Sequence, residues 1–250
     1  MRVIGTNYPR LPYYSDWLTE VAADNPYGWF KLNESSGNAS NAGSAGGTYA
    51  LGSTSGLTRL ASGLLTYSGN YAYSFNNTAS AYVSLGGTFN GDTLDLNNAV
   101  TFEGLVKFSS TTVGRAFICG QNADATGYLF DAYTDAGYVG LAGFVDNYFD
   151  TVVSVTTSVA VDTNAWYHVV YTFEANASTL YLNGEQVAVT PLANYTMVAT
   201  TGTNFINLLS RFNGSYSQSR NSSIDEIAIY RTALSPTRIR AHAVVAGLYS

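Results

Sequence analysis

The fold class of this chain is clearest in the stretch Trp166-Tyr-His-Val-Val-Tyr-Thr-Phe-Glu-Ala-Asn-Ala-Ser-Thr-Leu-Tyr-Leu-Asn-Gly-Glu-Gln-Val187. Its runs of β-branched and aromatic residues favour strands, and turn residues interrupt them twice. The second interruption is Asn183-Gly184. Because a two-residue hairpin needs positive φ at both turn positions, Asn-Gly forms it at the least steric cost. The stretch therefore predicts strand, turn, strand, tight turn and strand.

The composition indicates a folded, strand-rich protein with few charges. The 250 residues suffice for one large sandwich or two small domains, and 46% of them are hydrophobic, which argues against disorder. Only 11% are charged, so the solubility of the protein must come from Ser, Thr, Asn and Gly. A net charge of −6 without a basic patch argues against nucleic acid as a partner. The single cysteine, Cys119, cannot form an intrachain disulfide, and we expect it in the core.

The first 18 residues are expected to form an extended arm. Pro9 and Pro12 disfavour a helix there, and residues 16–23 can form a short helix with Ser15 or Asp16 as its N-cap. The chain lacks a signal-peptide segment and any stretch near the ~20 apolar residues of a membrane span, so we expect a soluble protein that is not exported by the usual route. We predict that the arm contacts a neighbouring subunit through Tyr8, Pro9, Arg10, Tyr13 and Tyr14.

Short segments of strand-forming residues recur between Gly and Asn turn signals, a pattern typical of a sandwich or barrel. Strands are predicted at residues 71–75, 81–85, 99–108, 115–120, 127–132, 137–144, 150–160, 166–174, 178–183, 186–190, 204–210 and 223–230. Residues 33–63, rich in Gly, Ser and Asn, are predicted to be loop. One C-terminal helix is predicted, with Ser235 as N-cap, Pro236 at its first position and Gly247 as its stop.

Three further segments share the pattern of a known family. They are Pro26-Tyr-Gly-Trp-Phe-Lys-Leu-Asn-Glu-Ser-Ser-Gly37, Ala99-Val-Thr-Phe-Glu-Gly-Leu-Val-Lys107 and Ser223-Ile-Asp-Glu-Ile-Ala-Ile-Tyr-Arg-Thr-Ala-Leu-Ser-Pro236. Together with Trp166–Val187 they resemble the laminin G-like, concanavalin A-like lectin domains over roughly residues 24–245. The opening segment is especially similar to those of minor tail and other structural proteins of tailed phages.

The resemblance implies an all-β, concanavalin A-like jelly-roll sandwich over residues 19–250, with one short C-terminal helix. Such domains hold surfaces and sugars far more often than they catalyse reactions. This chain departs from the family at Leu105, where a tryptophan is usual. Function inferred from fold remains an analogy, so the site residues have to be argued separately.

The sequence argues against glycoside hydrolysis, which requires two carboxylates placed across the scissile bond. The resembling glucanases carry Glu-x-Asp-x-x-Glu on one strand, whereas no glutamate of this chain has an aspartate two residues further on. Asp225 and Glu226 are adjacent, so on a regular strand they point to opposite faces. His168 is expected to be packed and hydrogen-bonded, and His242 lies too far along the chain to be named as its partner. We therefore predict that the protein is not an enzyme.

Sugar binding requires aromatic faces beside planar polar groups in a shallow site. The candidate residues for such a site are Tyr128, Asp131, Tyr133, Tyr138 and Tyr148, with core packing or a protein interface as the alternative role for the tyrosines. No cofactor or metal ligand is assigned. Ca²⁺ is the one cofactor to consider, because many resembling domains bind it through acidic loops. The acidic loops here are Asn90–Asp95 and Asp146–Asp150.

These observations lead to one expected function and two alternatives. We expect a non-enzymatic structural protein of a tailed-phage virion, either a capsid decoration or a minor tail component, that displays a lectin-like domain for adhesion to host-surface glycans. It would be made in the host cytoplasm, bind other virion proteins through its arm, occur as a homo-oligomer or in many copies, and insert into no membrane. The alternatives are a free-standing carbohydrate-binding module and, third, a glycan hydrolase.

Overall fold

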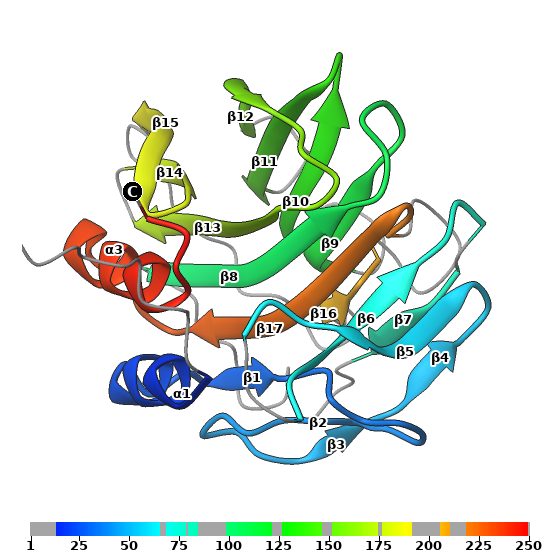
Figure 1. Cartoon of the computed structure of the whole chain (residues 1–250). Helices are drawn as coiled ribbons and strands as arrows, with labels where there is room; N and C mark the ends of the chain where they lie inside the picture. The colour runs from blue at the N-terminus through cyan, green and yellow to red at the C-terminus, as the bar shows by residue number, and fades with distance from the viewer. Residues whose placement is uncertain are drawn as a thin grey trace, which may run out of the picture.

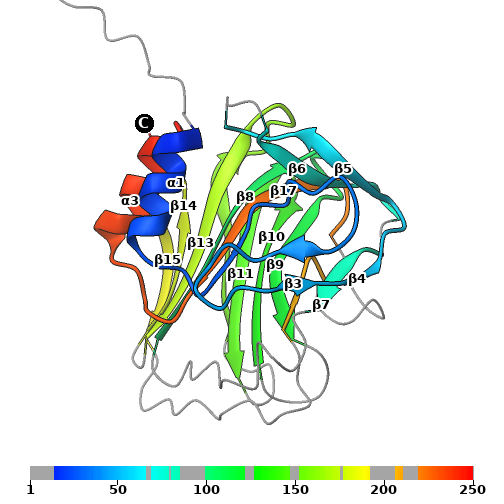
Figure 2. The ribbon, with the colours of Figure 1, turned by 90° about the horizontal axis from the view of Figure 1, so that it is seen from below.

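The computed structural model describes residues 14–65, 69–78, 80–84, 99–121, 127–146, 152–174, 177–191, 206–210 and 219–249. Two antiparallel β-sheets face each other, and helices α1 (Tyr14–Ala23) and α3 (Pro236–Val245) cover the outer face of one of them (Figure 1). Figure 2 shows the layers in turn as helices, first sheet and second sheet. The predicted all-β jelly-roll sandwich with a short C-terminal helix is confirmed.

The helix-covered sheet is called sheet I and the other sheet II. Sheet I has the order β15 (Glu185–Pro191), β14 (Ala177–Leu182), β13 (Trp166–Glu174), β8 (Ala99–Phe108), β17 (Ser222–Tyr230), β6 (Tyr71–Phe75) and β5 (Leu57–Ser62), and β1 (Gly28–Phe30) also pairs with β17. Sheet II has the order β12 (Val152–Ala160), β11 (Tyr138–Asp146), β10 (Gly127–Asp135), β9 (Arg115–Gln121), β16 (Ile206–Leu208), β7 (Tyr82–Ser84) and β4 (Leu51–Ser53). A separate small sheet pairs β2 (Ala39–Ser40) with β3 (Thr48–Tyr49).

The hairpin predicted from Asn183-Gly184 is present. Both residues have positive φ, at 52° and 83°, and they join β14 to β15, with Leu182 opposite Glu185. The strand before them, β13, has the predicted bounds and pairs with β8 along its whole length. A turn whose two positions require positive φ therefore locates the hairpin, although the adjoining strand ends lie one residue from the predicted positions 183 and 186.

The loop predicted for residues 33–63 is wrong in part, because this segment contains β2, β3, β4 and β5. The strand β5 carries an irregularity that hides its pattern. Leu60 has a φ of 55°, and the register with β6 shifts between Thr58 and Ala61. Such a bulge breaks the two-residue alternation by which a strand is recognised.

The main core lies between the two sheets, and β8 shows how the sequence divides the faces. Val100, Phe102, Val106 and Phe108 are buried in this core, while Leu105 faces the helices on the other side of sheet I. The alternation predicted for the strand is confirmed. Cys119 is fully buried in the main core, as predicted, and burial raises the pKa of its thiol.

A second core lies between sheet I and the helices. Trp17 of α1 and Ile239 of α3 are fully buried there against Leu105 and Val170. The α3 helix begins as predicted: the side chain of Ser235 accepts a hydrogen bond from the backbone N–H of Arg238 and Pro236 occupies the first turn. Gly247 follows the helix with a φ of 69°, the left-handed conformation that ends many helices.

The helix α1 begins at Tyr14, so the boundary drawn at residue 18 between arm and sandwich falls inside this helix. Trp17 is part of the second core and not of an extended arm. The anchoring residues Tyr8, Pro9, Arg10 and Tyr13 lie outside the described residues, and the role of the arm stays a prediction. In the part of the chain that the structure describes, no helix is long and apolar enough to cross a membrane.

Candidate functional site

The outer face of sheet II brings together two of the predicted sugar-binding residues. On β10, Phe130 and Ala132 point into the main core, so Asp131 and Tyr133 face away from sheet I. Tyr133 lies opposite Arg115 on one side and Gly140 on the other. The alternation of a strand that is apolar on one face only therefore presents an aromatic and an acidic side chain side by side.

Gly140 gives Tyr133 its position. A Cβ atom at residue 140 would collide with the Tyr133 ring, so the ring lies directly against the β11 backbone. Asp131 lies opposite another small residue, Ala142. The result is a half-buried aromatic ring that rests against the β11 backbone.

Arg115 is held on the same face by a buried carboxylate. Its Nε donates to Oδ2 of Asp131, and the Asp131 side chain is fully buried whereas that of Arg115 is partly exposed. The Arg115 guanidinium carbon lies 4.8 Å from the centroid of the Phe117 ring and 5.8 Å from that of Tyr133. This ion pair and the two rings fix the orientation of the guanidinium group.

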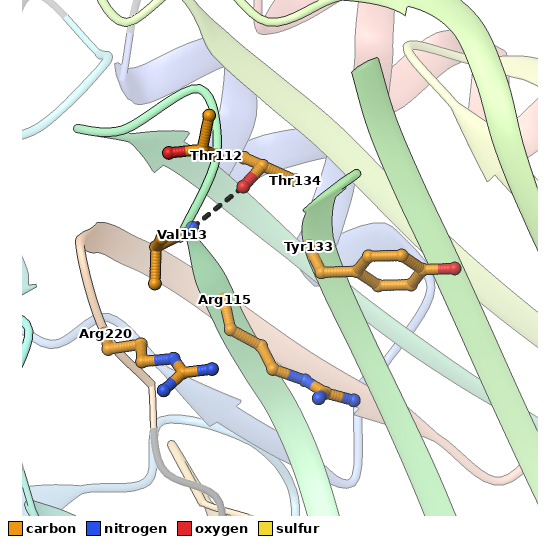
Figure 3. Close-up of a pocket in the computed structure, with 7 residues that line it drawn as sticks. Thr112, Val113, Arg115, Tyr133, Thr134 and Arg220 are labelled. Atoms are coloured by element: carbon orange, nitrogen blue, oxygen red, sulfur yellow. Dashed lines mark hydrogen bonds between the residues drawn. The ribbon is translucent and has the colours of Figure 1, made fainter. Parts of the chain in front are cut away.

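Arg220 is the second guanidinium at this place. Its backbone exchanges two hydrogen bonds with that of Arg115, with N···O distances of 2.8 and 2.9 Å, so the two arginines lie directly opposite each other. Both side chains line a pocket of about 180 Å³ (Figure 3), whose wall consists of Thr112, Val113, Gly114, Arg115, Tyr133, Thr134 and Arg220. The Thr134 hydroxyl accepts a hydrogen bond of 2.8 Å from the Gly114 N–H. Burial, and next the negative charge of Asp131, raise the pKa of Tyr133, so its hydroxyl is neutral.

The other predicted residues are placed as follows. Tyr138 is exposed at the β10–β11 turn, opposite Asp135, whose carboxylate accepts a hydrogen bond of 2.6 Å from the Thr156 hydroxyl. Tyr128 belongs to β10, and Tyr148 lies outside the described residues. The two arginines were missed from the sequence. Arg115 offers one signal, since it begins an otherwise apolar strand, but nothing local pairs it with Arg220.

The two acidic loops considered for calcium lie almost entirely outside the described residues. Asn90–Asp95 lies outside them, as do residues 147–150, while Asp146 ends β11. Within the described ranges, no group of three or more His, Cys, Asp and Glu side chains is placed to hold a metal ion. A calcium site in these acidic loops stays a prediction.

A second polar cluster is buried between sheet I and the helices. Glu103 Oε1 lies 2.6 Å from Nε2 of His168 and 2.8 Å from Nδ1 of His242, and Oε2 accepts a 2.7 Å hydrogen bond from the Tyr230 hydroxyl. His242 also lies 2.9 Å from a carboxylate oxygen of Asp24. His168 is packed and hydrogen-bonded, as predicted. His242 shares its acceptor although the two are far apart in sequence, because α3 folds back over β8 and β13.

Asp225 and Glu226 do not point to opposite faces, so that prediction is wrong. The register of β17 with β8 shifts between Asp225 and Ala228, and Glu226 has a φ of 51°, which marks a bulge. Glu226 Oε2 accepts hydrogen bonds of 3.1 and 2.7 Å from the indoles of Trp17 and Trp29, and Asp225 accepts one of 3.1 Å from Asn70. Both carboxylates are fully buried on the helix side of sheet I, and burial together with Glu226 raises the pKa of Asp225.

The family of the chain follows from comparison with known proteins. A laminin G model of the concanavalin A-like lectin/glucanases superfamily matches residues 76–240, about two thirds of the chain, and the chain belongs to this superfamily. No curated protein matches it in sequence. The match extends over parts of both sheets and includes the pocket, so the candidate site is built on a lectin-like sandwich.

Several solved structures share the fold. The binding domain of botulinum neurotoxin DC in complex with SialylT superposes with a TM-score of 0.58 at 8% identity, covering 87% of this chain and 50% of that chain. The receptor-binding domain of the botulinum neurotoxin C/D mosaic serotype gives 0.59 at 12% identity, with 87% and 50% covered. A structure of botulinum neurotoxin type C, whose cell entry depends on interaction with two ganglioside molecules, gives 0.57 at 9%, with 89% and 51% covered. The chain thus spans about half the length of these structures.

Proposed function

We propose that this protein is a non-enzymatic, glycan-binding protein and that the glycan lies on the outer face of sheet II. The observation that carries this proposal is the Tyr133 ring lying against Gly140 beside a polar pocket. A sugar ring stacks on an aromatic face while its hydroxyls bond to nearby planar polar groups. Arg115, Thr134 and Arg220 supply such groups within reach of the same pocket.

The fold relatives support a binding role without placing the site. The neurotoxin binding domain of this fold was solved with SialylT, and the type C toxin depends on two ganglioside molecules. Those ligands belong to proteins about twice the length of the part that matches. What the relatives contribute is a sandwich that occurs in glycan-binding proteins.

The buried carboxylates support binding over catalysis. Glu103, Asp225 and Glu226 are fully buried under the helices, and each accepts hydrogen bonds from neighbouring side chains. A glycoside hydrolase needs its two carboxylates on either side of a bound sugar. Incubation of the protein with the glycans that it binds should therefore release no reducing ends, and turnover that depends on any of these carboxylates would overturn this point.

The biological setting that we propose is the virion of a tailed phage, on the capsid or as a minor tail component. The support is the similarity of Pro26–Gly37 to the openings of phage structural proteins. Antibody labelling of virions from a phage that encodes this chain would show the protein on the particle. Its recovery only in the soluble fraction of the lysate would favour the alternative, a free-standing carbohydrate-binding module.

The direct test of glycan binding is an array screen of the purified chain, run with calcium and with a chelator. The wild-type chain should bind a defined set of glycans, and Tyr133→Ala should weaken that binding by about tenfold or more, equivalent to about 1.4 kcal/mol. Tyr71→Ala is the matched control, because Tyr71 is an exposed tyrosine of sheet I. Equal binding by the Tyr133 and Tyr71 variants would place the site elsewhere.

A further inference from the structure

We propose that the pocket on sheet II reads an anionic substituent of the sugar, a carboxylate or a sulfate, and that Arg220 is the residue that selects it. The inference rests on the proposed glycan binding and names the class of glycan. Figure 3 shows the two arginine side chains on one side of the pocket wall, while the Tyr133 ring extends away from Arg220. An anionic group in the pocket would leave the sugar ring free to lie over Tyr133.

The first argument is the position of the two arginines. They form a hydrogen-bonded antiparallel pair, a geometry that brings the two Cα atoms to about 5.5 Å. Like charges directly opposite each other on a sheet destabilise it. The chain has only 11 basic residues against 17 acidic ones, so two guanidinium groups at one pocket oppose the overall charge of the molecule. Such repulsion is expected where a bound anionic ligand offsets it.

The second argument is that, among the described residues, only one of the two arginines forms an ion pair. Asp131 is committed to Arg115 through the buried ion pair. Arg220 is exposed, and among the described residues its guanidinium has no ion pair or hydrogen bond. Counted over the described residues, Arg115, Asp131 and Arg220 sum to one positive charge at the pocket, which matches a singly charged ligand group.

The third argument concerns the pocket itself. Its volume of about 180 Å³ is below the ~300–1,000 Å³ of sites for drug-sized ligands, so it suits one charged substituent and not an oligosaccharide. The Thr134 hydroxyl accepts from Gly114, which leaves its own proton to donate to a ligand oxygen. The planar fork of an arginine donates to two oxygens of a carboxylate or sulfate at once. Thr134 of β10 and Arg220 therefore offer hydrogen-bond donors to an anion in the pocket from two segments of the chain.

The test measures binding of matched glycan pairs by calorimetry: sialyllactose and lactose, glucuronic acid and glucose, galactose sulfate and galactose. The wild-type chain should prefer the anionic member of at least one pair by about tenfold, and the preference should shrink as salt is raised from about 0.05 to 0.5 M. Arg220→Gln should abolish the preference and leave neutral binding unchanged, whereas Arg220→Lys should keep part of it. Arg240→Gln, an exposed arginine of α3, is the charge-matched control.

The outcomes separate the two proposals. Equal binding of anionic and neutral members, unaffected by Arg220→Gln, would overturn the anion selection and leave glycan binding standing. Binding of none of these sugars or of any glycan on the array would overturn both. The pair that shows the preference identifies the group as carboxylate or sulfate. Thermal melting checks the fold, and Arg220→Gln should melt no lower than the wild-type chain because it removes a like-charge contact.

Discussion

At the scale of single residues, the binding face depends on small side chains beside a large one. Gly140 lets the Tyr133 ring lie on the β11 backbone, and Gly104 allows the Ile118 side chain to approach β8 in the core. Neither position needs glycine for its backbone conformation, since neither residue has a positive φ. Their size is what the packing requires, and a pattern of hydrophobic and polar residues alone does not show it.

Gly140→Ala should test the support of the Tyr133 ring. The new methyl group collides with the ring and displaces it, so the free energy of unfolding should fall by about 1–3 kcal/mol and glycan affinity should fall with it. Urea unfolding and the array measure the two effects. Thr58→Ala, at an exposed position of β5 in sheet I, is the control. Unchanged affinity in the Gly140 variant would show that the ring position is irrelevant to binding.

Glu103→Gln should reveal how much the buried cluster contributes. The amide is uncharged and has an NH2 group where Oε2 accepts from Tyr230, and removing one partner from a buried ionic network costs about 3–5 kcal/mol. Glu174→Gln, at the exposed end of β13, should change stability by less than about 0.5 kcal/mol. Denaturant unfolding compares them, and equal stability of the two variants would contradict a structural role for Glu103.

At the scale of elements, the buried cluster joins both helices to sheet I. Glu103 lies on β8, His168 on β13 and His242 on α3, and Asp24 follows α1. Arg238 of α3 extends the chain of contacts by bonding to Asp24 and Glu20. The helices are therefore held by a polar network in addition to the second core.

The network predicts a stability maximum in mildly acidic solution. Burial raises the pKa of Glu103, but the two imidazoles outweigh it and hold that pKa well below its usual value of 4.5, so this contribution is lost as the pH falls. Burial lowers the pKa of His242, but Glu103 and Asp24 outweigh it and raise the pKa above 6.5, so this contribution is present below pH 6.5 and lost as the pH rises. Unfolding free energy should peak between about pH 4.5 and 6.5. A Glu103→Gln variant that kept the same profile would contradict this assignment.

Deletions from the N-terminus should distinguish the role of the arm from the role of α1 in stability. Removal of residues 1–13 leaves α1 complete and should leave the melting temperature unchanged, while abolishing incorporation into virions if the arm is the anchor. Removal of residues 1–24 also takes away Trp17 and Asp24, and with them the bonds to Glu226 and His242. That variant should melt at a clearly lower temperature or fail to fold. Equal melting of both would show that α1 contributes nothing to the sandwich.

The sequence predicted the elements that depend on local backbone requirements. Its predictions failed at β-bulges and missed contacts between residues far apart in the chain. Asn183-Gly184 and Pro236 placed a hairpin and a helix start because each satisfies a local backbone requirement. The bulge at Leu60 hid a strand that was predicted as loop, and the bulge at Glu226 placed this carboxylate on the same face as Asp225. Arg115 opposite Arg220, like His242 beside Glu103, comes from chain segments more than a hundred residues apart, and no local pattern reports such contacts.

At the scale of the whole molecule, the structural support given by the helices and the candidate binding site lie on different sheets. Sheet I carries the helices and the buried carboxylates Glu103, Asp225 and Glu226. Tyr133 and Arg115 of sheet II line the pocket together with Arg220, which is bridged to Arg115. Leu105, where the family usually has tryptophan, is buried in the second core, so this departure lies on the side of the molecule away from the candidate site. A binding face on sheet II is therefore unaffected by it.

The central claim is that a glycan lies on the outer face of sheet II, and amide chemical-shift mapping tests it most directly. The isotope-labelled chain would be titrated with the best glycan from the array. The account predicts saturable shifts at Tyr133, Thr134, Gly140 and Arg220, with the amides of α1 and α3 unmoved. Shifts confined to the helix side of sheet I, or to other surfaces, would contradict it.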